Sequence, residues 1–193
     1  MPAPSVYLLR HLARERFKDF ALRAPRRAGQ ARLERFIDGI CRAICAAWSQ
    51  WQSQARLSGV VIEGDVARGG KLLGPALGPL ILARAPTGSP WDRNRSRAIA
   101  ITLGEAWSAW LGSIFVPALA AGETPLSALG QTTARLNAMA LVSRMALALG
   151  EPLKGLDGEM LQSVAEAFVR CFRRWHATTT VTEVMGSGSG GLR

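Results

Sequence analysis

The chain has 193 residues, of which 48% are hydrophobic and 20% are charged, and it carries a formal net charge of +10. This composition excludes an intrinsically disordered chain, and the length is typical of one domain that can bury a core. The three cysteines, an odd number, fall inside apolar helical patterns, which argues against a disulfide-bonded secreted protein. Since the start of the chain has no signal-peptide pattern, we expect a cytoplasmic protein.

Basic residues are concentrated in the first part of the chain. The first 35 residues contain nine basic and three acidic side chains, a net charge of +6. Residues 5–24 alternate arginines with apolar residues, which predicts a basic amphipathic helix that Pro25 ends. We expect residues 1–30 to form a basic N-terminal arm. The arginines that we expect to contact an anionic partner are Arg23, Arg26, Arg27 and Arg32.

The first long helix is predicted over residues 31–57. Apolar side chains recur there at steps of three and four and form one stripe: Ile37, Ile40, Cys41, Ile44, Trp48, Trp51 and Ala55. A stripe of this length must face a core or a partner.

Residues 58–90 have a different character, because seven glycines and four prolines interrupt them. No helix is expected at that density, and we predict a long Gly/Pro-rich loop that lies on another part of the protein or on a partner. Within it, Val60-Val61-Ile62 is a candidate for a short strand.

Three further helices are predicted over residues 97–115, 132–149 and 158–176, each with its own apolar stripe. The stripe of the first is Ala100, Leu103, Trp107, Trp110 and Ile114, and that of the second is Leu136, Met139, Val142, Met145, Ala146 and Leu149. Residues 178–184 are β-branched almost throughout, which favours an extended strand. The glycines and serines of residues 186–191 predict a flexible tail. We therefore divide the chain into the N-terminal arm, a helical domain over residues 31–177 and an extended C-terminal tail over residues 178–193.

An aromatic pair at helical spacing occurs on three of the helices: Trp48 and Trp51, Trp107 and Trp110, and Phe172 and Trp175. Charged neighbours, which base stacking needs, are missing around the two tryptophan pairs, so core packing is the predicted role. A β-rich segment follows the first and third pairs. This indicates either an internal repeat, whose strands pair with each other or with other subunits, or a chance recurrence.

The residues that could form a catalytic or ligand site do not have the sequence spacing that such sites require. The glycines around Lys71 lack the first glycine and the hydroxyl residue of a phosphate-binding loop. Zinc ligands could come from Cys41, Cys45, Cys171 and His176. However, the first two lie on the apolar stripe, and the last two point apart on their helix. No histidine or carboxylate has the partners of an acid–base or nucleophilic site. We expect no enzymatic activity, no cofactor and no metal.

The predicted fold is mainly α: a four-helix core with a basic N-terminal helical arm, a long Gly/Pro-rich loop and a short β element near the C-terminus. The predicted function is that of a non-catalytic structural or assembly subunit of a larger oligomeric particle, of a phage or tail-like kind. Its partners would be copies of itself or other subunits, with no small-molecule substrate. The residues expected at the interface are Val60, Val61, Ile62, Val181, Thr182 and Val184.

Two alternatives come from other classes of protein. The first is a nucleic-acid-binding protein that uses the arginine-rich N-terminal arm on phosphates, with an affinity that falls steeply with salt. The second is a peripheral membrane protein that turns the arginines of residues 5–24 toward anionic lipid.

Overall fold

A computed structural model of the chain describes residues 2–21, 29–63, 66–114, 116–120, 124–126, 136–181 and 190–191. The helices in this part are α1 (Val6–Ala21), α2 (Gln30–Gln54), α3 (Leu77–Leu82), α4 (Pro90–Leu111), α6 (Ala138–Leu149) and α7 (Gly155–Thr178). The strands are β1 (Arg56–Glu63), β2 (Val66–Leu73), β3 (Val116–Ala120), β4 (Thr124–Pro125), β5 (Thr180–Val181) and β6 (Gly190–Gly191). The prediction of a mainly helical fold is confirmed.

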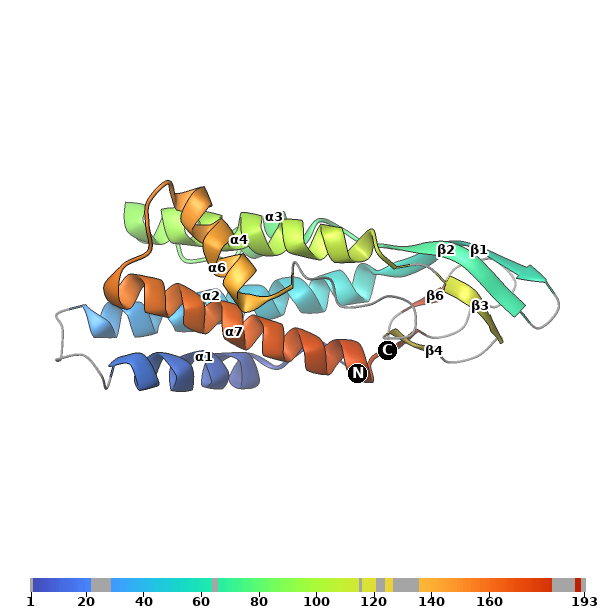
Figure 1. The fold of residues 1–193 in the computed structure, drawn as a ribbon, viewed down its shortest axis with the longest axis horizontal. Coiled ribbons are helices and arrows are strands. Elements are labelled where there is room, and N and C mark those ends of the chain that lie inside the picture. The colour runs from blue at the N-terminus through green and yellow to red at the C-terminus, as the bar shows by residue number, and fades with distance from the viewer. Residues whose placement is uncertain are drawn as a thin grey trace.

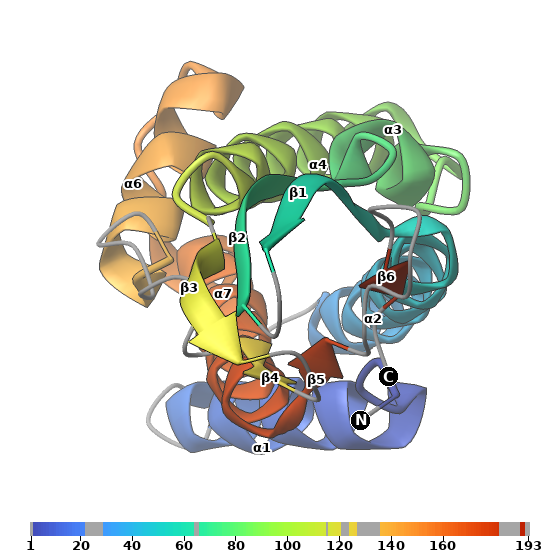
Figure 2. The same ribbon diagram turned by 90° about the vertical axis from the view of Figure 1, so that its right-hand side faces the viewer.

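The helices form an elongated body, and the strands lie at one end of it (Figure 1). The three longest helices, α2, α4 and α7, run along the body. α1 packs against α2 and α7, whereas α3 and α6 pack against α4. A view along the body shows α1 and α4 on opposite sides (Figure 2). The molecule therefore presents two separate helical faces, one built on α1 and one built on α4.

Aromatic rings join the three longest helices in the core. Trp48 of α2 meets Trp107 of α4 with ring centroids 5.0 Å apart, and it meets Trp175 of α7 at 5.2 Å. All five tryptophans of the predicted pairs are buried, as is Phe172. The prediction that the aromatic pairs pack in the core is therefore confirmed, and these rings are closed to a base or ligand from solvent.

The caps of two helices correct their predicted boundaries. α4 begins at Pro90, seven residues before the predicted start, because the Ser89 hydroxyl accepts a hydrogen bond from the Asp92 amide at 3.1 Å. α6 begins after Asn137, whose side chain accepts a hydrogen bond from the Met139 amide. It ends at Gly150, which has the left-handed conformation. Both ends follow the usual cap residues.

The prediction of a long loop over residues 58–90 is wrong, because most of this segment has regular structure. β1 and β2 form an antiparallel hairpin, with Arg56 paired to Leu73 at its base and Glu63 paired to Val66. The strand order of the larger sheet is β3-β2-β1-β6. The short helix α3 follows the hairpin and packs against α4. Glycine and proline density pointed to a loop, whereas several of these glycines are residues of the strands.

The structure also corrects the expectation of a separate N-terminal arm, since α1 packs in the body instead of standing apart from it. Leu9, Ala13 and Phe17 are fully buried on one side of it. Two ion pairs fix it to its neighbours: Arg14 to Asp38 of α2 and Arg16 to Glu166 of α7, each at 2.6 Å. Among the helices described, none has the length and hydrophobicity to cross a membrane.

The C-terminal segment also takes part in pairing. Thr180 and Val181 of β5 pair with β4, and Gly190 and Gly191 of β6 pair with β1. The strands that follow the first and third aromatic pairs, β1 and β5, thus lie in different sheets and do not pair with each other. The predicted interface residues Thr182 and Val184 lie outside the described residues.

Candidate partner interface

Three of the predicted interface residues lie in β1, and their environments differ. Val60 is buried, whereas 52% of Val61 is exposed to solvent. Ile62 follows in the same strand, paired to Ala67. Val181 lies in β5 instead, so the two predicted interface segments are not brought together by pairing. Of the predicted residues whose exposure the structure describes, Val61 is the one available to a partner.

Within the described part of the chain, one edge of β1 is open beyond Leu57. β2 pairs with β1 from Arg56 to Glu63, but β6 covers the other edge only at Arg56 and Leu57. From Ser58 onward, β1 has no second neighbour among the residues that the structure describes. An open strand edge offers unpaired amides and carbonyls to another strand, and this is the usual site of strand addition.

Glycines bend the hairpin just before the exposed valine. Gly59 in β1 and Gly70 in β2 have φ values of 75° and 84°, in the region that favours glycine. A Cβ added at Gly70 would lie 2.6 Å from Cγ2 of Val60, so no larger residue fits there without a shift. Regular alternation would place Leu57 and Val60 on opposite faces, yet both are buried. The bend therefore turns Val60 inward and leaves Val61 outward.

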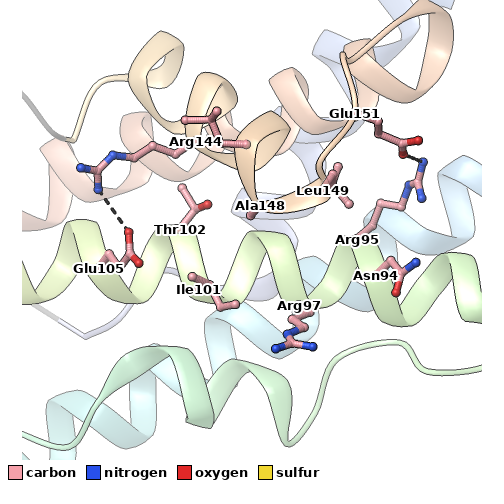
Figure 3. Close-up of a pocket in the computed structure, with 11 residues that line it drawn as sticks. Asn94, Arg95, Arg97, Ile101, Thr102, Glu105, Arg144, Ala148, Leu149 and Glu151 are labelled. Carbon is pink, nitrogen blue, oxygen red and sulfur yellow. Dashed lines mark hydrogen bonds and ion pairs between the residues drawn. The ribbon is translucent and has the colours of Figure 1, made fainter.

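A groove on the opposite side from α1 is a second candidate surface. It consists of two adjoining hollows, with volumes of about 860 Å³ and about 700 Å³, that share Ile101, Glu105 and Arg144. α4 forms the floor, α6 one wall and α3 the other. Figure 3 shows Arg144 of α6 reaching to Glu105 of α4, with 3.4 Å between the nitrogen and the oxygen.

Apolar side chains are exposed in this groove. Ile101 and Leu82 are each 39% exposed, and Leu147 of α6 is 81% exposed. α3 lies close to α4 at Gly78, because a Cβ there would meet the Ala100 carbonyl oxygen at 2.9 Å. Ile101 falls outside the apolar stripe of α4, so an apolar residue off the stripe was the signal in the sequence that could have indicated this groove.

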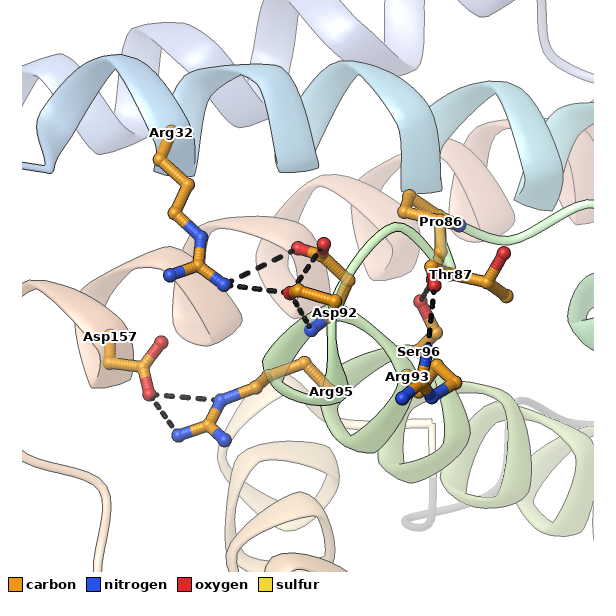
Figure 4. A network of polar contacts seen from close by, with 9 residues as sticks. Arg32, Pro86, Thr87, Asp92, Arg93, Arg95, Ser96 and Asp157 are labelled. Atoms are coloured by element: carbon orange, nitrogen blue, oxygen red, sulfur yellow. Dashed lines mark hydrogen bonds and ion pairs between the residues drawn. The ribbon is translucent and has the colours of Figure 1, made fainter.

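The one described arginine among the predicted anion contacts is already engaged within the chain. Arg32 donates to the Ser89 hydroxyl at 2.8 Å and lies 3.9 Å from Asp92, and its guanidinium covers the Trp91 ring at 4.5 Å (Figure 4). Its charge is therefore compensated, which argues against it as a phosphate contact. Arg23, Arg26 and Arg27 lie outside the described residues.

A neighbouring arginine ties α4 to α7. Arg95, only 12% exposed, donates from Nε and Nη2 to one oxygen of Asp157, at 3.1 and 2.6 Å, and from Nη2 to Glu151 at 2.7 Å. Its guanidinium also lies over Trp91, 4.9 Å from the ring centroid. This network has no nucleophile or acid–base pair in it, and its role is to hold the helices together.

The three cysteines are buried thiols. Burial raises the pKa of Cys45 to about 12 and that of Cys171 to about 11, and it raises the pKa of Cys41 as well. Thiols with such pKa values stay protonated at neutral pH and are poor nucleophiles and metal ligands. In the part of the chain that the structure describes, no group of three or more His, Cys, Asp or Glu side chains could hold a metal ion.

No family model, curated protein or solved structure matches the chain.

Proposed function

We propose that this chain is a non-catalytic assembly subunit that joins other copies of itself through the β1 edge. In this proposal the four-helix core predicted from the sequence is the rigid body, and the strands at its end are the attachment site. The observation that carries the proposal is the edge of β1 from Ser58, which has no second neighbour among the described residues, with Val61 exposed beside it.

A second copy is the occupant that this edge fits best. Residues 57–62 contain no charged side chain, so two such edges can approach without like-charge repulsion. Two β1 strands related by a two-fold axis would pair antiparallel and continue the sheet from one copy into the next. The groove over α4, with its exposed Ile101 and Leu82, remains free for other subunits of a larger particle.

Light scattering coupled to size exclusion tests this proposal. The unmodified protein is expected to have a molar mass that is a multiple of 20.7 kDa at high salt. Val61→Lys places a charge beside the edge and is expected to reduce the mass to that of the monomer. Met139→Lys is the matched control, because Met139 is 65% exposed and lies on α6, which belongs to neither sheet. A monomeric unmodified protein at all concentrations, or an equal effect of the two variants, would refute the proposal.

A further inference from the structure

In the half of the body near the strands, the described helical residues on the α1 side include no acidic residue. Ion pairs from Arg14 to Asp38 and from Arg16 to Glu166 align α1, which runs opposite to α2 and α7 (Figure 1). The first half of α1 therefore lies beside the second halves of these two helices. Residues 2–14, 39–54 and 167–181, which form this region, contain no aspartate or glutamate.

Five arginines in this region have no acidic partner: Arg10, Arg42, Arg170, Arg173 and Arg174. Among the described residues, no ion pair or hydrogen bond of their side chains is present, and all except the half-buried Arg10 are exposed. Arg10 lies on α1, Arg42 lies on α2 and the other three lie on α7, so these charges come from all three helices of the region. Uncompensated charge of one sign attracts a polyanion.

An exposed aromatic stack lies on the same helix as Arg10. Tyr7 and His11 of α1 are parallel, with ring centroids 6.0 Å apart and an interplanar angle of 2°. Tyr7 is 71% exposed, although large aromatic side chains are usually well buried. Proteins stack unpaired bases on exposed rings while nearby arginines neutralise the phosphates, and α1 carries both an exposed aromatic stack and Arg10.

The burial of α1 argues against a lipid surface as the partner. A helix that lies on a membrane inserts its apolar face among the lipids. In this structure the apolar face of α1, with Leu9, Ala13 and Phe17, is buried against α2 and α7. The side of α1 that faces solvent carries Tyr7, His11 and charged residues, so it has little apolar surface to insert.

We propose that this face, formed by Tyr7, His11 and the arginines of α1 and α7, binds single-stranded nucleic acid. Unpaired bases stack on Tyr7 and His11, and the phosphates contact Arg10, Arg170 and Arg174. The surface lies opposite the groove over α4, so one copy can bind nucleic acid and a protein subunit at once (Figure 2).

Fluorescence anisotropy with a labelled oligothymidine tests this inference, with a duplex of the same length as a comparison. We expect the single strand to bind more tightly than the duplex and the dissociation constant to rise steeply with salt. About three phosphate contacts give a slope of about 2 in the plot of log Kd against log salt concentration. Tyr7→Ala is expected to weaken binding about 10-fold, as loss of one stacked base does.

Arginine variants test whether binding depends on this face or on the positive charge of the whole protein. Arg170→Ala combined with Arg174→Ala is expected to weaken binding and to lower the salt slope by about 1. Arg97→Ala is the matched control, because Arg97 is an exposed arginine on α4, on the other side of the body. Its removal should leave the affinity within about 2-fold of that of the unmodified protein.

Three results would overturn the inference: no binding of oligothymidine at low salt, equal weakening by Arg97→Ala, or no effect of Tyr7→Ala. Vesicles of phosphatidylcholine and phosphatidylserine provide the membrane comparison, and capture by them in preference to the oligonucleotide would also overturn it. These measurements do not depend on the oligomeric state, so they are independent of the test of the β1 edge.

Discussion

Trp51 of α2 and Trp107 of α4 meet edge to face, with ring centroids 4.8 Å apart and ring planes at 82°. Trp107 also contacts the rings of Trp48, Trp110 and Phe172. It is therefore one of the two rings, with Trp110, through which the aromatic core joins α4 to α2 and α7.

Replacing Trp107 should cost more stability than replacing any surface tryptophan. Trp107→Ala leaves a cavity and removes several ring contacts, with an expected loss of about 3–5 kcal/mol in the free energy of unfolding. Trp91→Ala is the control, because Trp91 is only partly buried and should cost less. Urea denaturation followed by circular dichroism measures both losses. A larger loss for Trp91→Ala would contradict this view of the core.

A methyl group at Gly78 should destabilise the packing of α3 on α4. The added Cβ would meet the Ala100 carbonyl oxygen at 2.9 Å, and this oxygen belongs to the backbone of a long helix that cannot easily move. We expect Gly78→Ala to lower the free energy of unfolding by about 1–3 kcal/mol. At Gly112, the nearest atom to an added Cβ is the Ser108 carbonyl oxygen at 3.5 Å. Gly112→Ala should therefore be close to neutral when both variants are compared by urea denaturation.

Loss of the two hydrogen bonds from Arg95 to Asp157 should weaken the attachment of α7 to α4. Arg95→Lys keeps the charge but cannot donate from two nitrogens to Asp157, so we expect a loss of about 1–3 kcal/mol in the free energy of unfolding. The effect should shrink in high salt, since Asp157 and Glu151 are partly exposed. Arg93→Lys is the control, because Arg93 is exposed and donates only to the Thr87 carbonyl. Equal losses for the two variants would show that the hydrogen bonds from Arg95 to Asp157 add no more stability than the contact of an exposed arginine.

The buried thiols should make stability fall in alkaline solution. The pKa values of Cys45 and Cys171, about 12 and about 11 in the folded chain, lie above the ordinary value of 9.0. Above pH 9 the unfolded chain releases thiol protons that the folded chain keeps. Their contribution to stability is thus complete below pH 9 and is lost as the pH rises toward 11 and 12.

The slope of this loss is at most about 1.4 kcal/mol per pH unit for each thiol. Urea denaturation at a series of pH values from 8 to 11 measures it. Cys171→Ala removes one of the titrating groups and should make the slope shallower by the contribution of one thiol. An unchanged slope in this variant would mean that other groups cause the alkaline loss.

The helices were predictable where their pattern is strong and local. The stripe of α2 from Ile37 to Trp51 has an unbroken period near that of a helix, and its residues are buried. The stripe predicted for α6 was less accurate, because Met139 is 65% exposed whereas Leu141 is buried. α6 is short and largely apolar on all sides, so its sequence does not show which side faces the core.

The hairpin and the surfaces could not be predicted in the same way. Gly59 and Gly70 resemble loop residues in the sequence, and only the pairing of the residues on either side of them places them in a bent sheet. The engagement of Arg32 depends on Ser89 and Asp92, which are distant in the sequence, and the face around Tyr7 depends on α7 returning beside α1. Such sites come from tertiary packing, on which local sequence patterns carry no information.

The aromatic core has a consequence for how the chain reaches its fold. Its rings come from α2, α4 and α7, and the last of these begins only at Gly155. Until α7 is available, Trp48 and Trp107 have no Trp175 or Phe172 to pack against. The body is therefore expected to form late, in one cooperative step, and a nascent chain on the ribosome would expose its indoles until α7 has been made.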